Sequence, residues 1–134
     1  MATFNKFNSW AEVMVEGANL GSDAFVVALS NTAPSASNSV LADIAQISYT
    51  NLSARALTTA SSSQTGGVYS LSLNDLVLTA SGPVATFRYV VIYNDTVATP
   101  ADPLVCWFDY GSAITMANGE TFTIDFGANL LTVT

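Results

Sequence analysis

The chain has 134 residues, half of them apolar and only 10% charged, and its formal net charge is −7. Lys6, Arg55 and Arg88 are its only lysine and arginine residues, which excludes the basic face that nucleic-acid binding requires and disfavours an anionic membrane surface. The sequence contains no histidine, so histidine-activated serine or cysteine nucleophiles and most transition-metal sites are excluded as well.

A chain of this length is expected to fold as one domain over residues 1–134. An ordinary soluble domain is about 25% charged, so this surface must consist largely of serine, threonine, asparagine and alanine. Such a neutral surface suits large permanent contacts with other protein, and an ordinary Ser/Thr-rich β-domain is the alternative. The first ten residues hold no apolar run of signal-peptide length, and no stretch approaches the ~20 apolar residues of a membrane helix. We therefore expect a cytosolic product.

Residues 1–22 carry the only clear helical pattern and predict a short N-terminal helical segment or arm. Ser9 and Glu12 are spaced as an N-cap and a capping box, and Gly17 or Gly21 is expected to end the helix. An apolar stripe follows the same segment, formed by Phe7, Trp10 and Met14. The stripe either packs on its own domain or lies on a neighbouring subunit.

The following residues contain one clear strand and much irregular chain. Residues 23–30 are strongly apolar and predict a strand, whereas residues 31–39 hold the turn formers and small polar residues of a loop. Residues 39–44 are expected to form one helical turn or a short arm, and residues 49–59 to be extended. Residues 60–67 combine small polar side chains with two glycines, which predicts a flexible or contact-ordered loop.

From Val68 onwards the β pattern becomes regular. Residues 68–73 alternate apolar and polar side chains and predict a half-buried strand, a turn or bulge begins at Asn74-Asp75, and residues 76–79 are expected to continue extended. Residues 84–111 predict two strands joined by a polar, proline-bearing loop, and much of both strands is apolar on both faces. A strand of that kind must be covered twice, by a second sheet and by something else.

The C-terminal part predicts a closing hairpin and a last strand. Asn118-Gly119 between extended runs is a strong hairpin signal, followed by a strand over residues 120–126 and another over 129–134. No long helices alternate with the strands, so a parallel sheet is not expected. The predicted fold is all-β, an antiparallel two-sheet β-sandwich of jelly-roll-like type with a short N-terminal helix.

Few residues offer chemistry. A pair of carboxylates would serve a glycosidase, but the candidates lie beside turns, where aspartate ordinarily bonds to the backbone; they are Asp95, Asp102, Asp109, Glu120 and Asp125. Asp95 and Asp102 are the candidates for a loop calcium site, and Trp107 and Tyr110 for stacking on a sugar ring. Cys106 lies in an apolar strand and is interpreted as a core residue. We expect no catalytic residues, no cofactor and no metal.

Several motifs from residue 61 to residue 126 resemble a family of small virion proteins of tailed bacteriophages. They are Thr65-Gly66-Gly67, Phe87-Arg88-Tyr89, Tyr93-Asn94-Asp95, Asp102-Pro103-Leu104, Asp109-Tyr110-Gly111 and residues 118–122. Residues 4–7 and 29–34 also fit, so the resemblance covers most of the chain. It implies a non-enzymatic structural protein, made in the host cytoplasm and located in the virion. Size and acidity fit capsid cement, or decoration, proteins on the capsid exterior.

The resemblance implies the major capsid protein as partner, together with self-association as a dimer or trimer. A tail or fibre component is the alternative within the same family, and a carbohydrate-binding β-sandwich module is the alternative outside it. Contacts are expected in residues 4–10, 37–44 and 61–67. The predicted contact side chains are Phe4, Phe7, Trp10, Val40, Leu41, Ile44, Ser63 and Gln64.

Overall fold

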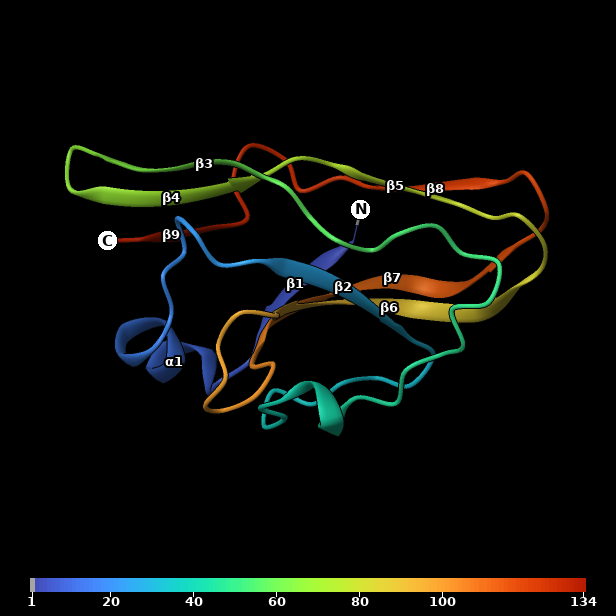
Figure 1. Cartoon of the computed structure of the whole chain (residues 1–134), viewed down its shortest axis with the longest axis horizontal. Coiled ribbons are helices and arrows are strands. Elements are labelled where there is room, and N and C mark those ends of the chain that lie inside the picture. Colours follow the sequence, from blue (N-terminus) through green and yellow to red (C-terminus); the bar gives the residue numbers. More distant parts are fainter. Residues whose placement is uncertain (1) are drawn as a thin grey trace.

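A computed structural model describes residues 2–134 as a mostly β structure with one short α-helix (Figure 1). In chain order the elements are β1 (Thr3–Lys6), α1 (Trp10–Glu16), β2 (Phe25–Ser30), the 3₁₀ turn η1 (Leu41–Asp43), β3 (Thr59–Thr65), β4 (Val68–Leu73), β5 (Leu76–Thr79), β6 (Val84–Asn94), β7 (Leu104–Met116), β8 (Thr121–Ile124) and β9 (Leu131–Val133). All strand pairs are antiparallel. The predicted all-β fold with a short N-terminal helix is confirmed.

The strands form two layers. One layer is a four-stranded sheet in the order β1-β7-β6-β2. The other contains the sheets β3-β4-β9 and β5-β8, which follow one another end to end in Figure 1. The break between these two sheets falls where β4 gives way to β5, at the turn predicted from Asn74-Asp75. There the Phe126 backbone N–H donates to the Asp75 carboxylate at 3.1 Å.

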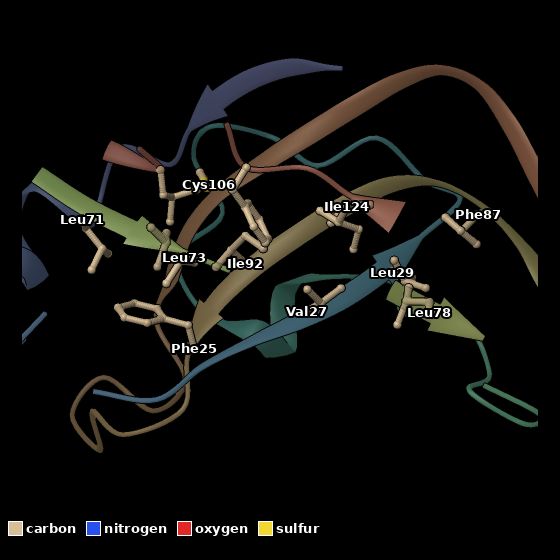
Figure 2. Packing of buried hydrophobic residues seen from close by; sticks show 14 of the residues in the cluster. Phe25, Val27, Leu29, Leu71, Leu73, Leu78, Phe87, Ile92, Cys106 and Ile124 are labelled. Atoms are coloured by element: carbon tan, nitrogen blue, oxygen red, sulfur yellow. The ribbon is translucent and has the colours of Figure 1, made fainter. Parts of the chain in front are cut away.

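The main core fills the space between the layers. Apolar side chains from both layers interdigitate there, as Figure 2 shows, among them Phe25, Val27, Leu29, Leu71, Leu73, Leu78, Phe87, Ile92, Cys106 and Ile124. The alternation of apolar residues in β4 places Leu71 and Leu73 on this side, as a strand period of two requires. Cys106 is fully buried, in agreement with its interpretation as a core residue.

A second, smaller cluster covers the outer face of the four-stranded sheet. Its buried members are Phe7, Ala28, Ile44, Val91, Tyr93 and Leu104, with Leu41 and Trp107 packed against them. Phe7 and Ile44 come from irregular chain outside the sheet, and the segment around η1 lies across this face in Figure 1. The second cover of the doubly apolar strands is therefore supplied by the chain itself.

The N-terminal segment is only partly helical. Residues 3–6 form strand β1, paired with β7, which the helical pattern did not predict. Ser9 is the residue before α1, as predicted, but its side chain makes no capping bond, so the expected capping box with Glu12 is wrong. Gly17 ends the helix as expected, and Trp10 and Val13 are buried against the chain's own core.

Two further predictions are wrong. Residues 60–67 do not form a flexible loop, because β3 pairs with β4 through the turn at Gly66-Gly67. Both glycines have positive φ, which a two-residue hairpin turn requires. Asn118-Gly119 does form a turn, but the strands on either side belong to different layers, since β7 pairs with β6 and β8 pairs with β5.

One side of the sandwich is closed by residues 46–57, here called the closing segment. The segment follows the free edge of β2. The Ile47 and Leu57 backbone N–H groups donate to the carbonyls of Leu29 and Phe25, at 3.0 and 2.9 Å. Val27 donates to the Arg55 carbonyl at 3.0 Å and accepts from its guanidinium. The outward backbone groups of β2, from the Phe25 carbonyl to the Leu29 carbonyl, therefore have partners within the chain.

Two side chains hold the closing segment in place. The Tyr49 hydroxyl accepts a hydrogen bond from the Leu29 N–H at 3.0 Å and donates to Gln46 at 2.7 Å. The Arg55 guanidinium lies 3.6 Å from the centre of the Tyr49 ring, a cation–π distance. Burial raises the pKa of Tyr49, which keeps the hydroxyl protonated and able to donate. The same segment also reaches the other layer, where Ser53 donates to the Thr79 carbonyl at 3.1 Å.

Candidate contact surface

The structure divides the predicted contact residues into three groups. Phe7, Trp10 and Ile44 are buried in the chain's own clusters, with exposed fractions of 0%, 2% and 8%. Their side chains pack within the chain's own clusters and support the fold, and Trp10 also lines a groove described below. Val40 and Leu41 are half-buried on the outer-face cover. Phe4, Ser63 and Gln64 are exposed, Phe4 at 44%.

The exposed Phe4 lies beside a groove on the side of the sandwich opposite β2. The groove has a volume of about 500 Å³ and lies between β1, α1 and the C-terminal strand β9, so both layers contribute to its walls. We call it the open-side groove; its main lining residues are Phe4, Lys6, Trp10, Met14, Leu130 and Val133. The predicted residues Ser63 and Gln64 do not line it.

Two further hollows share lining residues with the open-side groove. One shares Phe4 and Leu130 with it and extends to Phe108 and Asp125. The other shares Met14 and Val133 and extends along the end of α1 to Val15 and Leu20. Three of the exposed large hydrophobic residues lie along this path, namely Phe4, Val15 and Val133. A continuous, largely apolar track on one side of a small domain is typical of a binding surface.

Strand β1 presents unpaired backbone groups to this groove. The Phe7 N–H donates to the Val105 carbonyl at 3.3 Å, and backbone bonding alternates along an antiparallel pair. Asn5 therefore faces β7, while the backbone groups of Phe4 and Lys6 face away from it. Within residues 2–134 no hydrogen bond reaches those outward groups. The β1 edge is thus open, in contrast to the edge of β2.

Charge is also distributed unevenly around the surface. Arg88 forms a two-bond ion pair with Asp109, at 2.8 and 3.2 Å, and Arg55 is bound to the closing segment and β2. In the part of the chain that the structure describes, Lys6 is the one lysine or arginine in no ion pair or side-chain hydrogen bond. Its side chain lines the open-side groove. The groove therefore carries an available positive charge on an otherwise acidic protein.

The groove also contains a polar group without a partner. The Trp10 indole Nε1 is buried and has no hydrogen-bond acceptor among the described residues. The neighbouring Ser9 hydroxyl is in the same state. Buried polar groups of this kind are rare in folded proteins, and each has a cost of its own. Of the two residues, Trp10 lines the open-side groove.

In the motifs around Asn94 and Asp109, polar side chains bond to turn backbone, whereas Asp95 and Asp102 accept no backbone hydrogen bond among the described residues. The buried Asn94 side chain donates to the Asp23 carboxylate at 2.7 Å and accepts from the N–H groups of Thr96 and Val97 at 2.9 and 3.1 Å. Asp109 accepts from the Gly111 N–H at 2.8 Å as well as from Arg88. The Arg88 side chain holds the pKa of Asp109 below its usual value. These motifs fasten turns to the core.

The candidate calcium residues lie close together but without further ligands. Partial burial and the neighbouring Asp95 carboxylate raise the pKa of Asp102. Across residues 2–134, no group of three or more acidic, histidine or cysteine side chains is arranged to hold a metal ion. Glu120 and Asp125 are taken up in turns, where they accept from the Ala117 and Gly127 N–H groups at 2.6 and 2.7 Å.

The candidate sugar-stacking residues do not share a surface. Trp107 belongs to the outer-face cluster, where its ring lies 4.6 Å from that of Phe7. Tyr110 packs on the main core, with its ring 5.0 Å from that of Phe122. The two rings therefore cannot stack on one sugar. Burial raises the pKa of the Cys106 thiol, so it stays protonated inside the core.

Comparisons of the chain with protein-family models, curated proteins and solved structures gave no match. Among residues 2–134, no helix has the length and apolar character to cross a membrane. The surface features must therefore support the function themselves. Sequence reasoning identified Phe4 but missed Lys6 and Val133, which lie at opposite ends of the chain. The only available signal was the unusual placement of a lysine between two phenylalanines.

Proposed function

We propose that this protein is a non-enzymatic structural protein of a tailed-phage virion, a cement protein that docks on the capsid exterior and bridges major capsid subunits. The open-side groove would form the docking surface. Burial of Phe4, Val15 and Val133 would supply most of the binding free energy, at about 25 cal/mol per Å² of apolar surface. Repetition over the shell would multiply weak contacts into avidity. Self-association as a dimer or trimer on the shell belongs to the same proposal.

The observation that carries the proposal is the concentration of exposed apolar side chains and unpaired strand edge on one side of a domain with few charges. A low surface charge lowers the cost of removing water from a contact. The resemblance to small virion proteins supplies the biological setting. It covers most of the chain, including the loop motifs that the structure uses to fasten turns.

The test is a copy count on purified particles. Cement is expected at a copy number comparable with that of the major capsid protein, because it repeats over the shell. A far smaller number would favour the alternative, a tail or fibre component. Complete absence from the particles would contradict both assignments. If the protein is present, imaging of intact particles would show whether it lies on the capsid exterior.

The contact itself is best tested with surface variants. Deletion of residues 4–10 would remove β1 together with the buried Phe7 and Trp10, so it would test folding. Phe4→Ser leaves the core intact, and Val77→Ser on β5 is its matched control, because Val77 is exposed but lies outside the groove. We expect Phe4→Ser to lower the copy number and Val77→Ser to leave it unchanged. Equal copy numbers for the two variants would contradict docking through the groove.

A further inference from the structure

The two sides of the sandwich are closed to different degrees. On the β2 side the closing segment lies along the edge of one layer and bonds to the other. On the β1 side no segment of residues 2–134 does so, and the open-side groove occupies the corresponding place. We propose that an extended segment of a partner protein fills this place by adding a strand to β1. The proposal deepens the assembly role given above and rests on it.

The β1 edge favours an extended chain as the occupant. Phe4 and Lys6 each present a backbone N–H and C=O to the groove side, two residues apart, which is the spacing that a neighbouring strand uses. An extended partner would satisfy these groups with backbone hydrogen bonds, as in other cases of strand addition. The closing segment forms backbone hydrogen bonds of this kind with the edge of β2 within this chain.

The side chains around the groove define what that segment would carry. Phe4 and Lys6 point to the same face of β1, and both line the groove. Side chains directly opposite them on an added strand would point to that face as well. Apolar residues would pack on Phe4 and Val133, and a carboxylate would face Lys6. The expected partner segment therefore alternates inward apolar residues and includes one aspartate or glutamate.

A second copy of this chain fits less well. Pairing of β1 with another β1 would bring Thr3–Lys6 into the groove, and this strand has no carboxylate to face Lys6. Each copy also has a net charge of −7. An inward lysine on an edge strand is a known device against unselective strand pairing. Here it would reject self-pairing and admit a strand of complementary charge.

A displayed library of random twelve-residue peptides tests the inference directly. The library is selected on the whole protein, after removal of peptides that bind the Phe4→Ser variant. We expect the selected peptides to alternate apolar residues and to share one aspartate or glutamate. Peptides with helical spacing, or no enrichment over the variant, would overturn the proposal. So would self-association of the protein alone, measured by sedimentation, if Phe4→Ser abolished it.

Amide hydrogen exchange then locates the bound peptide. At a peptide concentration ten times its Kd, exchange at the Phe4 and Lys6 amides should slow roughly tenfold. Asn5 is the internal control, because its N–H already faces β7. Lys6→Glu should weaken binding about fivefold, and a peptide with lysine in place of its carboxylate should restore it. Unchanged exchange at Phe4 and Lys6 with saturating peptide would refute strand addition.

The outcomes separate this inference from the proposed function. Peptides that bind the groove, with no protein found on particles, would keep strand addition and reject the virion role. Unchanged amide exchange at Phe4 and Lys6 with saturating peptide, together with a full copy number on particles, would keep the virion role and reject strand addition.

Discussion

Replacement of Ile44 by alanine tests whether the segment around η1 belongs to the fold or to a contact with another subunit. Ile44 is 8% exposed and packs with Phe7 and Leu104 on the outer face of the four-stranded sheet. Each methyl or methylene group removed from such a site costs about 0.8 kcal/mol, so the transfer loss is about 2.4 kcal/mol. The site lies at the rim of a small cluster, where neighbours can relax, so a large cavity term is not expected.

We therefore expect Ile44→Ala to lower the free energy of unfolding by about 2–3 kcal/mol. Urea unfolding should show an earlier midpoint with an unchanged slope, as a pure loss of stability requires. Ala42→Ser, on an exposed neighbour in η1, is the control and should stay within about 0.5 kcal/mol of the wild type. Wild-type stability of Ile44→Ala, combined with loss of particle binding, would show that Ile44 contacts a partner and that the packing argument is wrong.

Three further changes test other parts of the structure. Asn94→Ala should cost about 3 kcal/mol in urea unfolding, because it deletes three hydrogen bonds and strips a partner from the buried Asp23 carboxylate. In the wild type, the stabilising pair between Asp109 and Arg88 is present at neutral pH and is lost as the pH falls through the lowered pKa of Asp109. Asp109→Asn lacks this pair, so its free energy of unfolding should fall less steeply below about pH 4. Cys106 should react with a thiol reagent only after unfolding, because the thiol is buried and its pKa is raised.

Each of these three has its own control. Asn8→Ala, on an exposed asparagine, should leave stability unchanged, and an equally mild Asn94→Ala would refute the role of the buried amide. Wild type and Asp109→Asn should converge in acid; a constant gap between them down to pH 3 would exclude the ion pair as its cause. Ser63→Cys places a thiol on exposed β3 and should be labelled at once in the native protein. Equally fast labelling of Cys106 would contradict its burial.

The regular part of the fold was predictable because its evidence is local. Alternation over Val68–Leu73 specifies a half-buried strand without knowledge of its neighbour. The apolar runs in β6 and β7 specified strands with two covered faces. What covers the second face was not predictable, because the answer depends on a loop far away in the sequence. Ile44 looked like a contact residue for the same reason.

Strands with weak local patterns were missed. β1 contains one phenylalanine and one lysine on its inward face, and β3 has almost no apolar side chains, so neither has an alternating apolar pattern. Both are strands because they pair with a neighbour, β1 with β7 and β3 with β4. Asn118-Gly119 gave the turn correctly, but a turn sequence does not reveal whether its strands pair or separate into two layers. The open-side groove was not predictable either, because Phe4 and Val133 lie near opposite ends of the sequence.

The unpaired edge of β1 also determines which partners the groove rejects. Phe4 and Lys6 present two N–H and two C=O groups, and burial of each without a hydrogen bond costs about 1–3 kcal/mol. Full burial of a phenylalanine side chain gains only about 1.5–3 kcal/mol, and Phe4 is already more than half buried. A helix or a flat apolar surface would gain from Phe4 and lose more at the backbone. Only an extended chain both pairs with the β1 backbone and buries Phe4. The open strand edge therefore selects an extended partner, whatever side chains that partner carries.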